Sequence, residues 1–182
     1  FWASHDASLF SSRQEAIAIA QEELAHFMPA FEQHFEEIMR AKLGWRGADS
    51  ADGERIATIF RHMMQGGADF TLFFRRLTQV AGGADSTIMS PLFTTPEEAA
   101  ACLAAWRERA GETPDVAAMR RANPVYIARN HRVEQALAAA SAGDLAPTDR
   151  LLNVLATPFT EQPGCTDLEA PPAAEEEVRQ TF

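Results

Sequence analysis

The sequence is poor in cysteine, in lysine and in long apolar stretches: its 182 residues include two cysteines and a single lysine, Lys42. Two cysteines cannot form a disulfide framework, which excludes the small disulfide-rich scaffolds. No run of about 18 uncharged apolar residues is present to span a bilayer, and the start of the chain lacks the basic and apolar regions of a secretory signal. These absences predict a protein of a reducing, cytoplasmic compartment with no membrane partner.

Basic residues are also in deficit, because 26 acids face 16 lysines and arginines and the net charge is −10. Nucleic-acid binding depends on clustered Lys and Arg, and no basic stripe here is longer than a pair, so we expect no nucleic-acid partner. The length and the 46% hydrophobic content are those of one soluble globular domain or two small ones. Because the first residue is Phe1 rather than Met, we expect a portion of a longer protein whose chemistry can lie outside this chain.

Apolar residues at helical spacing run through the sequence and predict an all-α fold, an irregular multi-helix bundle. A capping box at residues 12–15 opens a long segment that ends near Lys42. Pro29 lies inside this segment; because it lacks an N–H and clashes with the preceding turn, it is expected to kink the helix or split it in two. The apolar face of the segment comprises Ile17, Leu24, Met28, Phe31, Phe35 and Ile38.

Two more apolar stripes, at residues 56–64 and 70–80, are each followed by a pair of glycines that is expected to end a helix. Asp69 is the expected N-cap of the second of these helices. Residues 84–95 show no clear period and are expected to form a surface loop. We expect the Phe and Met stripes of the helices to form the core.

A Thr or Asn followed by Pro recurs ahead of helical segments. At Thr95 the proline is followed by two glutamates, so the cap hydroxyl, the preset proline φ and the acids at the positive end of the helix dipole all favour a helix start. The same pattern predicts helix starts at Thr113 and at Asn123.

The last helix is expected at residues 147–155. Beyond Pro158 the chain is rich in Pro, Gly and acids, a composition that is typical of extended or mobile chain. We therefore expect a helical domain of residues 1–158 followed by an acidic, Pro-rich tail of residues 159–182.

Tests for catalytic and metal-binding motifs give no candidate. Lys42 stands between Ala and Leu, so it is not part of a Gly-Lys-Ser/Thr phosphate-binding loop. Glu23 and His26 have the Glu-x-x-His spacing of di-iron bundles, but the second such motif that these sites need is missing. Cys102 is predicted to be core, whereas Cys165 is predicted to be an accessible thiol in the tail. We therefore predict no catalytic residue, no cofactor-binding residue and no metal ligand.

Two stretches stand out from the helical pattern: NPVYIARN at residues 123–130 and NVLATPFTEQPG at residues 153–164. A plain account of them is a helix cap, a buried Arg paired with an acid, and a Pro-rich exit turn. From these stretches we single out six structural or interface residues: Asn123, Tyr126, Arg129, Asn130, Glu161 and Gln162.

These stretches resemble the C-terminal region of the SelO family, also called the YdiU or UPF0061 family. There an NP-x-Y-x-x-RN motif is followed by a helix, a Gly-Asp pair, a Leu-rich helix and NPF-x-EQPG. Thr157 replaces the family's usual Asn before Pro-Phe. Upstream, MRAKLGW at residues 39–45 and DFTLFFRRL at residues 69–77 are also similar to family motifs, so that the resemblance covers about residues 39–164.

The resemblance implies a place among protein-kinase-like enzymes, or pseudokinases, that transfer AMP from ATP to Ser, Thr or Tyr hydroxyls of proteins with Mg or Mn. The Gly-rich loop, the Lys–Glu pair and the Asn and Asp groups that such transfer uses lie upstream in the family, and this chain lacks them. The chain is then expected to be a C-terminal helical part that is not catalytic by itself. Its partners are an upstream kinase-like domain of the same polypeptide and, for the complete enzyme, protein substrates.

The family's redox-active Cys or selenocysteine near the C-terminus cannot be assigned here, because Cys165 is not at the matching place. A free-standing helical protein-interaction module is the alternative that the sequence leaves open.

Overall fold

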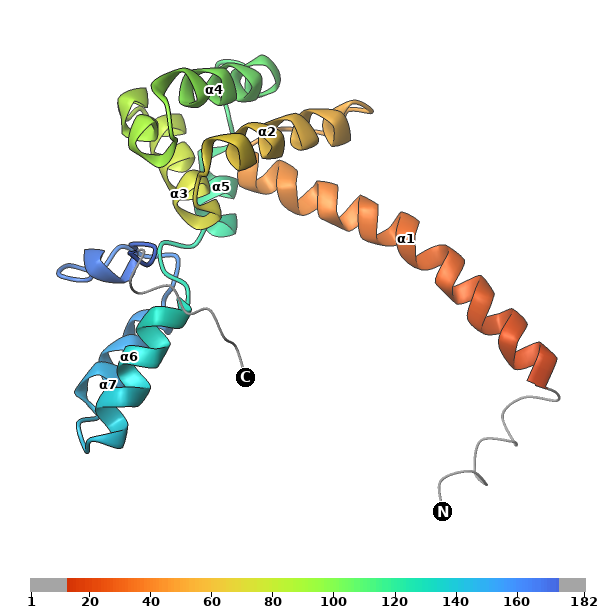
Figure 1. Cartoon of the computed structure of the whole chain (residues 1–182). Helices are drawn as coiled ribbons and strands as arrows, with labels where there is room; N and C mark the ends of the chain where they lie inside the picture. Colours follow the sequence, from red (N-terminus) through yellow and green to blue (C-terminus); the bar gives the residue numbers. More distant parts are fainter. Residues whose placement is uncertain (1–12, 174–182) are drawn as a thin grey trace. The chain divides into compact units, whose positions relative to one another are not determined.

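The computed structural model describes residues 13–173, except for the side chain of Gln14, and the elements in this part are all helical (Figure 1). The α-helices are α1 (Arg13–Leu43), α2 (Asp52–Gly66), α3 (Phe70–Ala81), α4 (Pro96–Ala110), α5 (Val116–Ala122), α6 (Asn130–Ser141) and α7 (Ala146–Leu155), and the 3-10 helices are η2 (Ser86–Leu92) and η3 (Thr166–Leu168). The all-α prediction is confirmed. None of the helices within residues 13–173 is both long enough and apolar enough to cross a bilayer. The chain divides into two compact units, Phe1–Ile38 and Met39–Phe182.

α1 passes through Pro29 without interruption, so of the kink or split expected at this proline, the split is wrong. Figure 1 shows α1 as one continuous ribbon. Pro29 is exposed on the helix surface, where water can bond the backbone carbonyl that the missing N–H leaves free. One lost hydrogen bond in an exposed helix is therefore not enough to end it. The expected capping residue, Ser12, lies outside the described residues.

The apolar face on the first part of α1 is exposed, which corrects the expectation that it belongs to the core. Leu24 is 70% exposed and Phe31 is 52% exposed. Along α1 the first side chain described as buried is that of Met39. Helical spacing identifies an amphipathic helix, but it does not say whether the surface that covers the apolar face lies in the same chain.

The main core of the unit Met39–Phe182 lies among α2, α3, α4 and the end of α1. α2 packs against α4, and α3 packs against η2 and α5. The fully buried rings of Phe73 and Phe74 meet edge to face, with their centroids 5.1 Å apart. The Trp106 indole N–H donates to the carbonyl of Leu43 at 2.9 Å and so ties α4 to the end of α1. Cys102 is buried in this core as predicted, and burial raises its pKa to about 12.

Most of the local signals for helix ends are confirmed. Asp69 and Thr95 accept backbone N–H groups as the N-caps of α3 and α4, and Gly67 ends α2 in the left-handed conformation. α5 begins later than expected, because its N-cap is Asp115 rather than Thr113. The carboxylate of Asp115 accepts an N–H of the first turn, a bond that the hydroxyl two residues earlier does not make.

The helix expected to start at Asn123 does not form there, and α6 begins only at Asn130. Asn123 instead is the C-cap of α5. The backbone N–H groups of Val125 and Tyr126 both donate to the carbonyl of Pro158, at 2.8 and 3.2 Å. These N–H groups are thus bonded to a distant part of the chain, so residues 123–129 do not form a helix.

The described part of the expected tail, residues 159–173, contains η3 and a buried side chain, Leu168. A second, smaller core is formed by Val125, Tyr126, Val154 and Leu168. An extended conformation is therefore wrong for η3, because its leucine has apolar neighbours to pack against. The domain boundary at residue 158 stays a prediction, and residues 174–182 lie outside the described part.

A buried carboxylate that sequence reasoning did not single out links three helices. Asp52 is fully buried, and its oxygens lie 2.8 Å from Nε of Arg109 on α4 and 3.6 and 3.7 Å from the guanidinium groups of Arg40 on α1 and Arg55 on α2. It also accepts the backbone N–H of Asp49 at 3.0 Å. One negative charge inside the protein therefore holds three arginines in place.

Gly44 follows the last residue of α1 in the left-handed conformation, with φ 69°, beside Met119 of α5. A Cβ added at Gly44 would lie 2.6 Å from the Met119 sulfur. We expect Gly44→Ala to lower the free energy of unfolding by about 2–3 kcal/mol, from the left-handed penalty and overpacking together. Gly47→Ala is the matched control, since Gly47 has φ 65° and no atom within 4 Å of an added Cβ. Equal losses for both variants in urea denaturation would contradict the packing contribution.

Candidate functional site

Five of the six residues singled out in the sequence lie along α3, where residues 123–129 and 157–162 approach it. These five are Asn123, Tyr126, Arg129, Glu161 and Gln162, and together with their hydrogen-bond partners we call them the polar junction. The sixth, Asn130, is exposed at the first position of α6 and lies outside the junction.

Asn123 is buried against the C-terminal part of α3. Its amide group donates to the hydroxyl of Thr78 at 2.9 Å and to the carbonyl of Lys42 at 2.8 Å. Its side-chain oxygen accepts the Lys42 ammonium at 3.3 Å. Both donors and the acceptor of this buried amide are therefore bonded, as burial of a polar group requires.

Lys42, the only lysine in the sequence, is fixed at the same place. Besides its bond to Asn123, its ammonium donates to the carbonyl of Ala122 at 2.9 Å. The nitrogen lies 5.1 and 5.6 Å from the ring centroids of Phe74 and Phe70, a cation–π arrangement. Partial burial lowers the pKa of Lys42. Sequence reasoning tested this lysine only against a phosphate-binding loop and missed its contacts; the signal available was its place inside MRAKLGW.

Tyr126 and Gln162 join the two sequence motifs to each other. The Tyr126 hydroxyl accepts the backbone N–H of Gln162 at 3.0 Å and donates to the Gln162 carbonyl at 3.3 Å. The Gln162 side-chain amide in turn donates to the carbonyl of Val154 and to the hydroxyl of Thr157, at 2.9 and 3.1 Å. Thr157, which stands where the resembling motif has Asn, thus supplies an acceptor to the junction.

Arg129 forms a two-pronged ion pair with Asp69, the N-cap of α3. Two nitrogens of the guanidinium each lie 2.9 Å from a carboxylate oxygen, and the side chains are 7% and 25% exposed. Burial alone raises the pKa of Asp69, but hydrogen bonds from Arg129 and from the N–H of Leu72 outweigh it and hold the pKa below its ordinary value. The Asp69 carboxylate therefore caps α3 and also fixes the end of residues 123–129. The buried Arg paired with an acid that we expected from the sequence is present here.

Glu161 pairs with Arg75 in the middle of α3. The Arg75 side chain is 9% exposed whereas that of Glu161 is 67% exposed, so the pair lies at the edge of the junction. Burial lowers the pKa of Arg75, although a guanidinium stays charged at any physiological pH. Arg75 thus binds the stretch of residues 153–164 to α3. Asp69 and Thr78 bind the stretch of residues 123–130 to the same helix.

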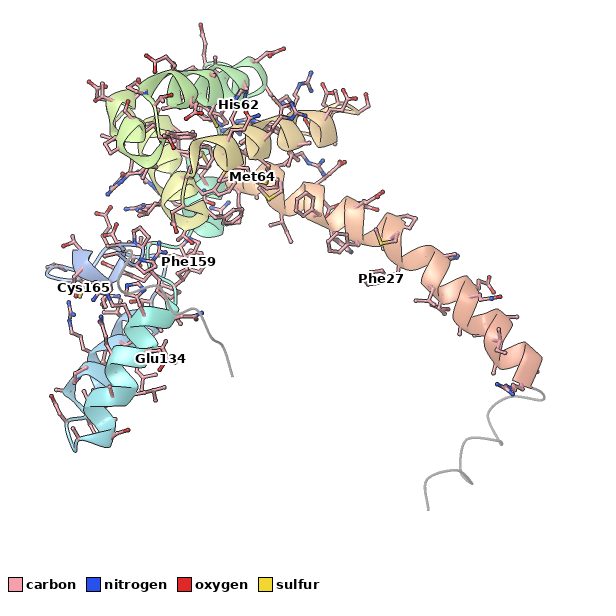
Figure 2. The ribbon with its side chains drawn as sticks, in the orientation of Figure 1. Phe27, His62, Met64, Glu134, Phe159 and Cys165 are labelled. Carbon is pink, nitrogen blue, oxygen red and sulfur yellow. The ribbon has the colours of Figure 1, made fainter. Side chains whose placement is uncertain are left out.

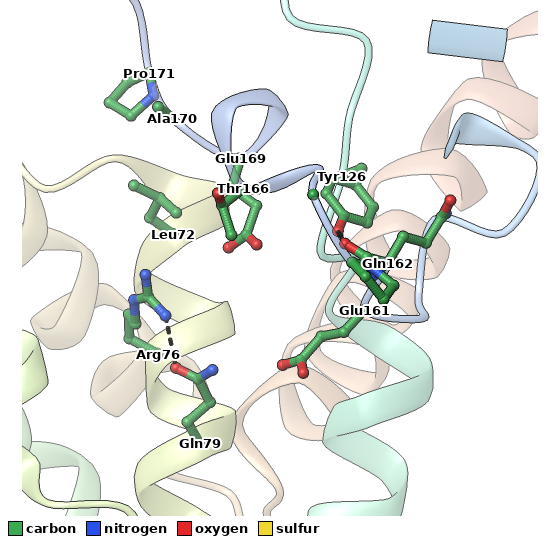
Figure 3. A pocket seen from close by; sticks show the side chains of 12 residues that line it. Leu72, Arg76, Gln79, Tyr126, Glu161, Gln162, Thr166, Glu169, Ala170 and Pro171 are labelled. Carbon is green, nitrogen blue, oxygen red and sulfur yellow. Dashed lines mark hydrogen bonds between the residues drawn. The ribbon is translucent and has the colours of Figure 1, made fainter. Parts of the chain in front are cut away.

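An open pocket of about 630 Å³ lies between α3 and residues 161–171 (Figure 3). Arg76 and Gln79 line it from α3 and are hydrogen-bonded to each other at 2.9 Å. Glu161 and Glu169 also line it, so its walls carry charges of both signs. In the part of the chain that the structure describes, no group of three or more His, Cys, Asp or Glu is placed to hold a metal ion.

A family model described as protein adenylyltransferase SelO matches residues 14–156, which run from α1 to just beyond α7. The chain belongs to the SelO family. The resemblance noted in the sequence is thereby confirmed, and the match also includes residues 14–38 of α1, which the sequence motifs did not cover.

Individual relatives align along most of this SelO chain. The protein nucleotidyltransferase YdiU of Rhodopseudomonas palustris (strain BisB18) is 40% identical over 181 residues, which are 96% of this chain and 37% of the relative. The protein of the same name from Cereibacter sphaeroides (strain ATCC 17023) is 50% identical over 133 residues, 72% of this chain and 27% of the relative. That of Rhizobium leguminosarum bv. trifolii (strain WSM2304) is 43% identical over 159 residues, 84% of this chain and 32% of the relative. The chain therefore spans about a third of the length of these SelO relatives.

The SelO match contains the residues of α3 that hold the polar junction and that sequence reasoning missed. From the sequence we predicted Asp69 only as a helix cap, and we did not single out Arg75 or Thr78. Arg75 and Thr78 are three residues apart, which makes them neighbours on the surface of α3, and Asp69 lies at its N-cap. Polar residues at this spacing, in a helix otherwise rich in Phe and Leu, are the signal that could have found them.

We expect Tyr126→Phe in this SelO chain to lower the free energy of unfolding by about 1–2 kcal/mol, because the ring stays packed while a buried hydrogen-bond partner is lost. Tyr126 is only 2% exposed, so water cannot readily replace its hydroxyl. Ser141→Ala is the control, since that exposed hydroxyl bonds only the carbonyl of Leu137 in its own helix. A loss for Tyr126→Phe no larger than that of the control, measured by urea denaturation, would contradict the role given to the hydroxyl.

Proposed function

We propose that this chain is the C-terminal helical part of a SelO protein adenylyltransferase and is not catalytic by itself. In this proposal the complete polypeptide transfers AMP from ATP to Ser, Thr or Tyr hydroxyls of proteins, with Mg or Mn. The observation that carries the proposal is coverage: the chain aligns with about a third of relatives that are named protein nucleotidyltransferases. The rest of such a polypeptide is where we expect the catalytic groups.

In this proposal the side chains of the described residues bind neither ATP nor its metal ion. The only lysine, Lys42, donates to Ala122 and Asn123 inside the fold. The pocket beside α3 carries Glu161 and Glu169 as well as Arg76, so it has no excess of positive charge to attract a triphosphate. Residues 13–173 also contain no cluster of potential metal ligands. We therefore assign no step of the nucleotide transfer to this chain.

The polar junction supports a structural role within the proposed enzyme. Three pairs fix both sequence motifs to α3: Asp69 with Arg129, Arg75 with Glu161, and Thr78 with Asn123. Because these bonds are largely buried, they hold the loops of the unit in one arrangement. A fixed helical unit of this kind suits a part that supports an upstream kinase-like domain of the same polypeptide.

The test is saturable ATP binding, measured by calorimetry on this chain and on the complete SelO polypeptide, with and without Mg. We expect binding only by the complete polypeptide, together with AMP transfer to protein detected as a mass increase. Saturable ATP binding by this chain alone would overturn the proposal.

A free-standing helical protein-interaction module is the second candidate, in which the apolar face of α1 would be the surface that binds a partner. Solution behaviour distinguishes the two candidates. A monomer that unfolds cooperatively would favour the module, whereas aggregation of the isolated chain through an exposed apolar surface would favour a part of a larger enzyme.

A further inference from the structure

The first part of α1 presents a continuous apolar face to solvent. Its large side chains are Ile17, Leu24, Phe27, Met28, Phe31, Phe35 and Ile38, each between 37% and 70% exposed. The rings of Phe27, Phe31 and Phe35 stack in series, with 6.1 Å between successive centroids, and Figure 2 shows Phe27 projecting from the helix. An apolar surface of this kind, arranged in order along one helix, is typical of an interaction site.

The remaining surface of the same helix is acidic. Between residues 14 and 39 it carries six glutamates and no lysine or arginine. With about 100° between successive residues, Glu22 and Glu37 fall opposite the apolar face, and Glu23 and Glu32 fall at its two edges. A surface that covers this face is therefore expected to be apolar in the middle and basic at the rim.

We propose that this face of α1 docks on an apolar groove with Lys and Arg at its rim, in the part of the SelO polypeptide outside this chain. The inference rests on the proposed function, since it takes the chain as part of a longer enzyme. The SelO match begins at residue 14, so the family region includes α1, and about two thirds of each relative lies outside the alignment. A second copy of α1 is a poorer occupant, because it would bring two acidic helices together without a compensating base.

Thiol labelling tests the docking without a disruptive substitution. Leu24→Cys places a thiol on the apolar face, and Ile19→Cys, about 140° away around the helix, is the matched control on an exposed apolar residue of the other face. Both variants carry Cys165→Ser, while Cys102 is buried and its high pKa keeps it unreactive. The rate of maleimide labelling at each introduced site is measured by mass spectrometry in this chain and in the complete SelO polypeptide.

In this chain we expect the two sites to react at similar rates. In the complete polypeptide we expect labelling at Leu24→Cys to slow by about tenfold or more, with no change at Ile19→Cys. Equal labelling of the two sites in the complete polypeptide would overturn the proposal. Protection of Leu24→Cys in this chain that grows with its concentration would also overturn it, in favour of a second copy. Protection in a complete polypeptide that transfers no AMP would support the docking face and reject the proposed enzyme function.

Discussion

Asp52→Asn is expected to lower the free energy of unfolding by about 3–5 kcal/mol, the cost of removing one partner from a buried ion-pair network. The carboxylate is fully buried, and Arg40 and Arg109 beside it have side chains that are only 15% exposed. Without the negative charge, the guanidinium groups of Arg40 and Arg109 lose this carboxylate in a poorly solvated place, whereas Arg55 keeps Asp49 at 3.0 Å. The asparagine keeps the size of the side chain, so the loss reports the charge rather than a cavity.

Glu54→Gln is the matched control for this change, because it neutralises an exposed acid on the same helix, α2. We expect it to change the free energy of unfolding by less than about 0.5 kcal/mol. Both variants are compared by urea denaturation at neutral pH. A loss for Asp52→Asn of less than about 1 kcal/mol, the range of exposed pairs, would show that the arginines find other partners.

Arg129→Met is expected to cost about 2–3 kcal/mol, less than the change at Asp52, because the partner carboxylate of Asp69 is a quarter exposed and can take up water. Methionine keeps much of the apolar stem, so the loss reports the ion pair. Asp69→Asn is the complementary variant: asparagine is as good an N-cap as aspartate, so α3 keeps its cap while the charge is removed. Arg61→Met, on an exposed arginine of α2, is the control and should be close to neutral.

The same pair predicts a dependence of stability on pH. Since the pKa of folded Asp69 lies below its ordinary value of 3.8, the folded state binds the proton more weakly than the unfolded state. The stabilisation is therefore fully present above the ordinary value and is lost as the pH falls through the pKa of the folded protein. Between about pH 5 and pH 2.5 the parent chain should lose more stability than Asp69→Asn, as followed by thermal unfolding. Parallel curves for the two proteins would show that Asp69 contributes nothing to acid sensitivity.

The sequence predicts well those features, such as helix caps, that depend on residues close together in the chain. The caps at Asp69 and Thr95 depend on a side chain and an N–H a few residues apart, and the structure confirms both. The helix expected at Asn123 depended on the same local pattern and is wrong, because the decisive bonds go to the carbonyl of Pro158. Local patterns give no information about a partner that lies 30 or more residues away in the chain.

The candidate site was predictable as a set of residues but not as a geometry. The two motifs contained the five residues on which the polar junction is built, and the sixth residue singled out, Asn130, is exposed. The α3 partners were harder to find, because Arg75 and Thr78 follow ordinary helical spacing and become distinctive only when the motifs are placed against them. Asp52 was missed for a related reason: its arginines come from three helices, and no spacing along the chain reveals such a convergence.

The carbonyl of Pro158 receives the N–H groups of Val125 and Tyr126, and between these points the chain runs out along α6 and back along α7, which pack against each other. The two helices therefore form an arm whose ends are fastened together at its base. Lengthening or shortening the arm would leave the base unchanged, because the cost of closing such a loop rises only slowly with its length. We therefore expect the far end of the arm, where α6 meets α7, to tolerate a change of length without disturbing the residues that hold the two motifs to α3.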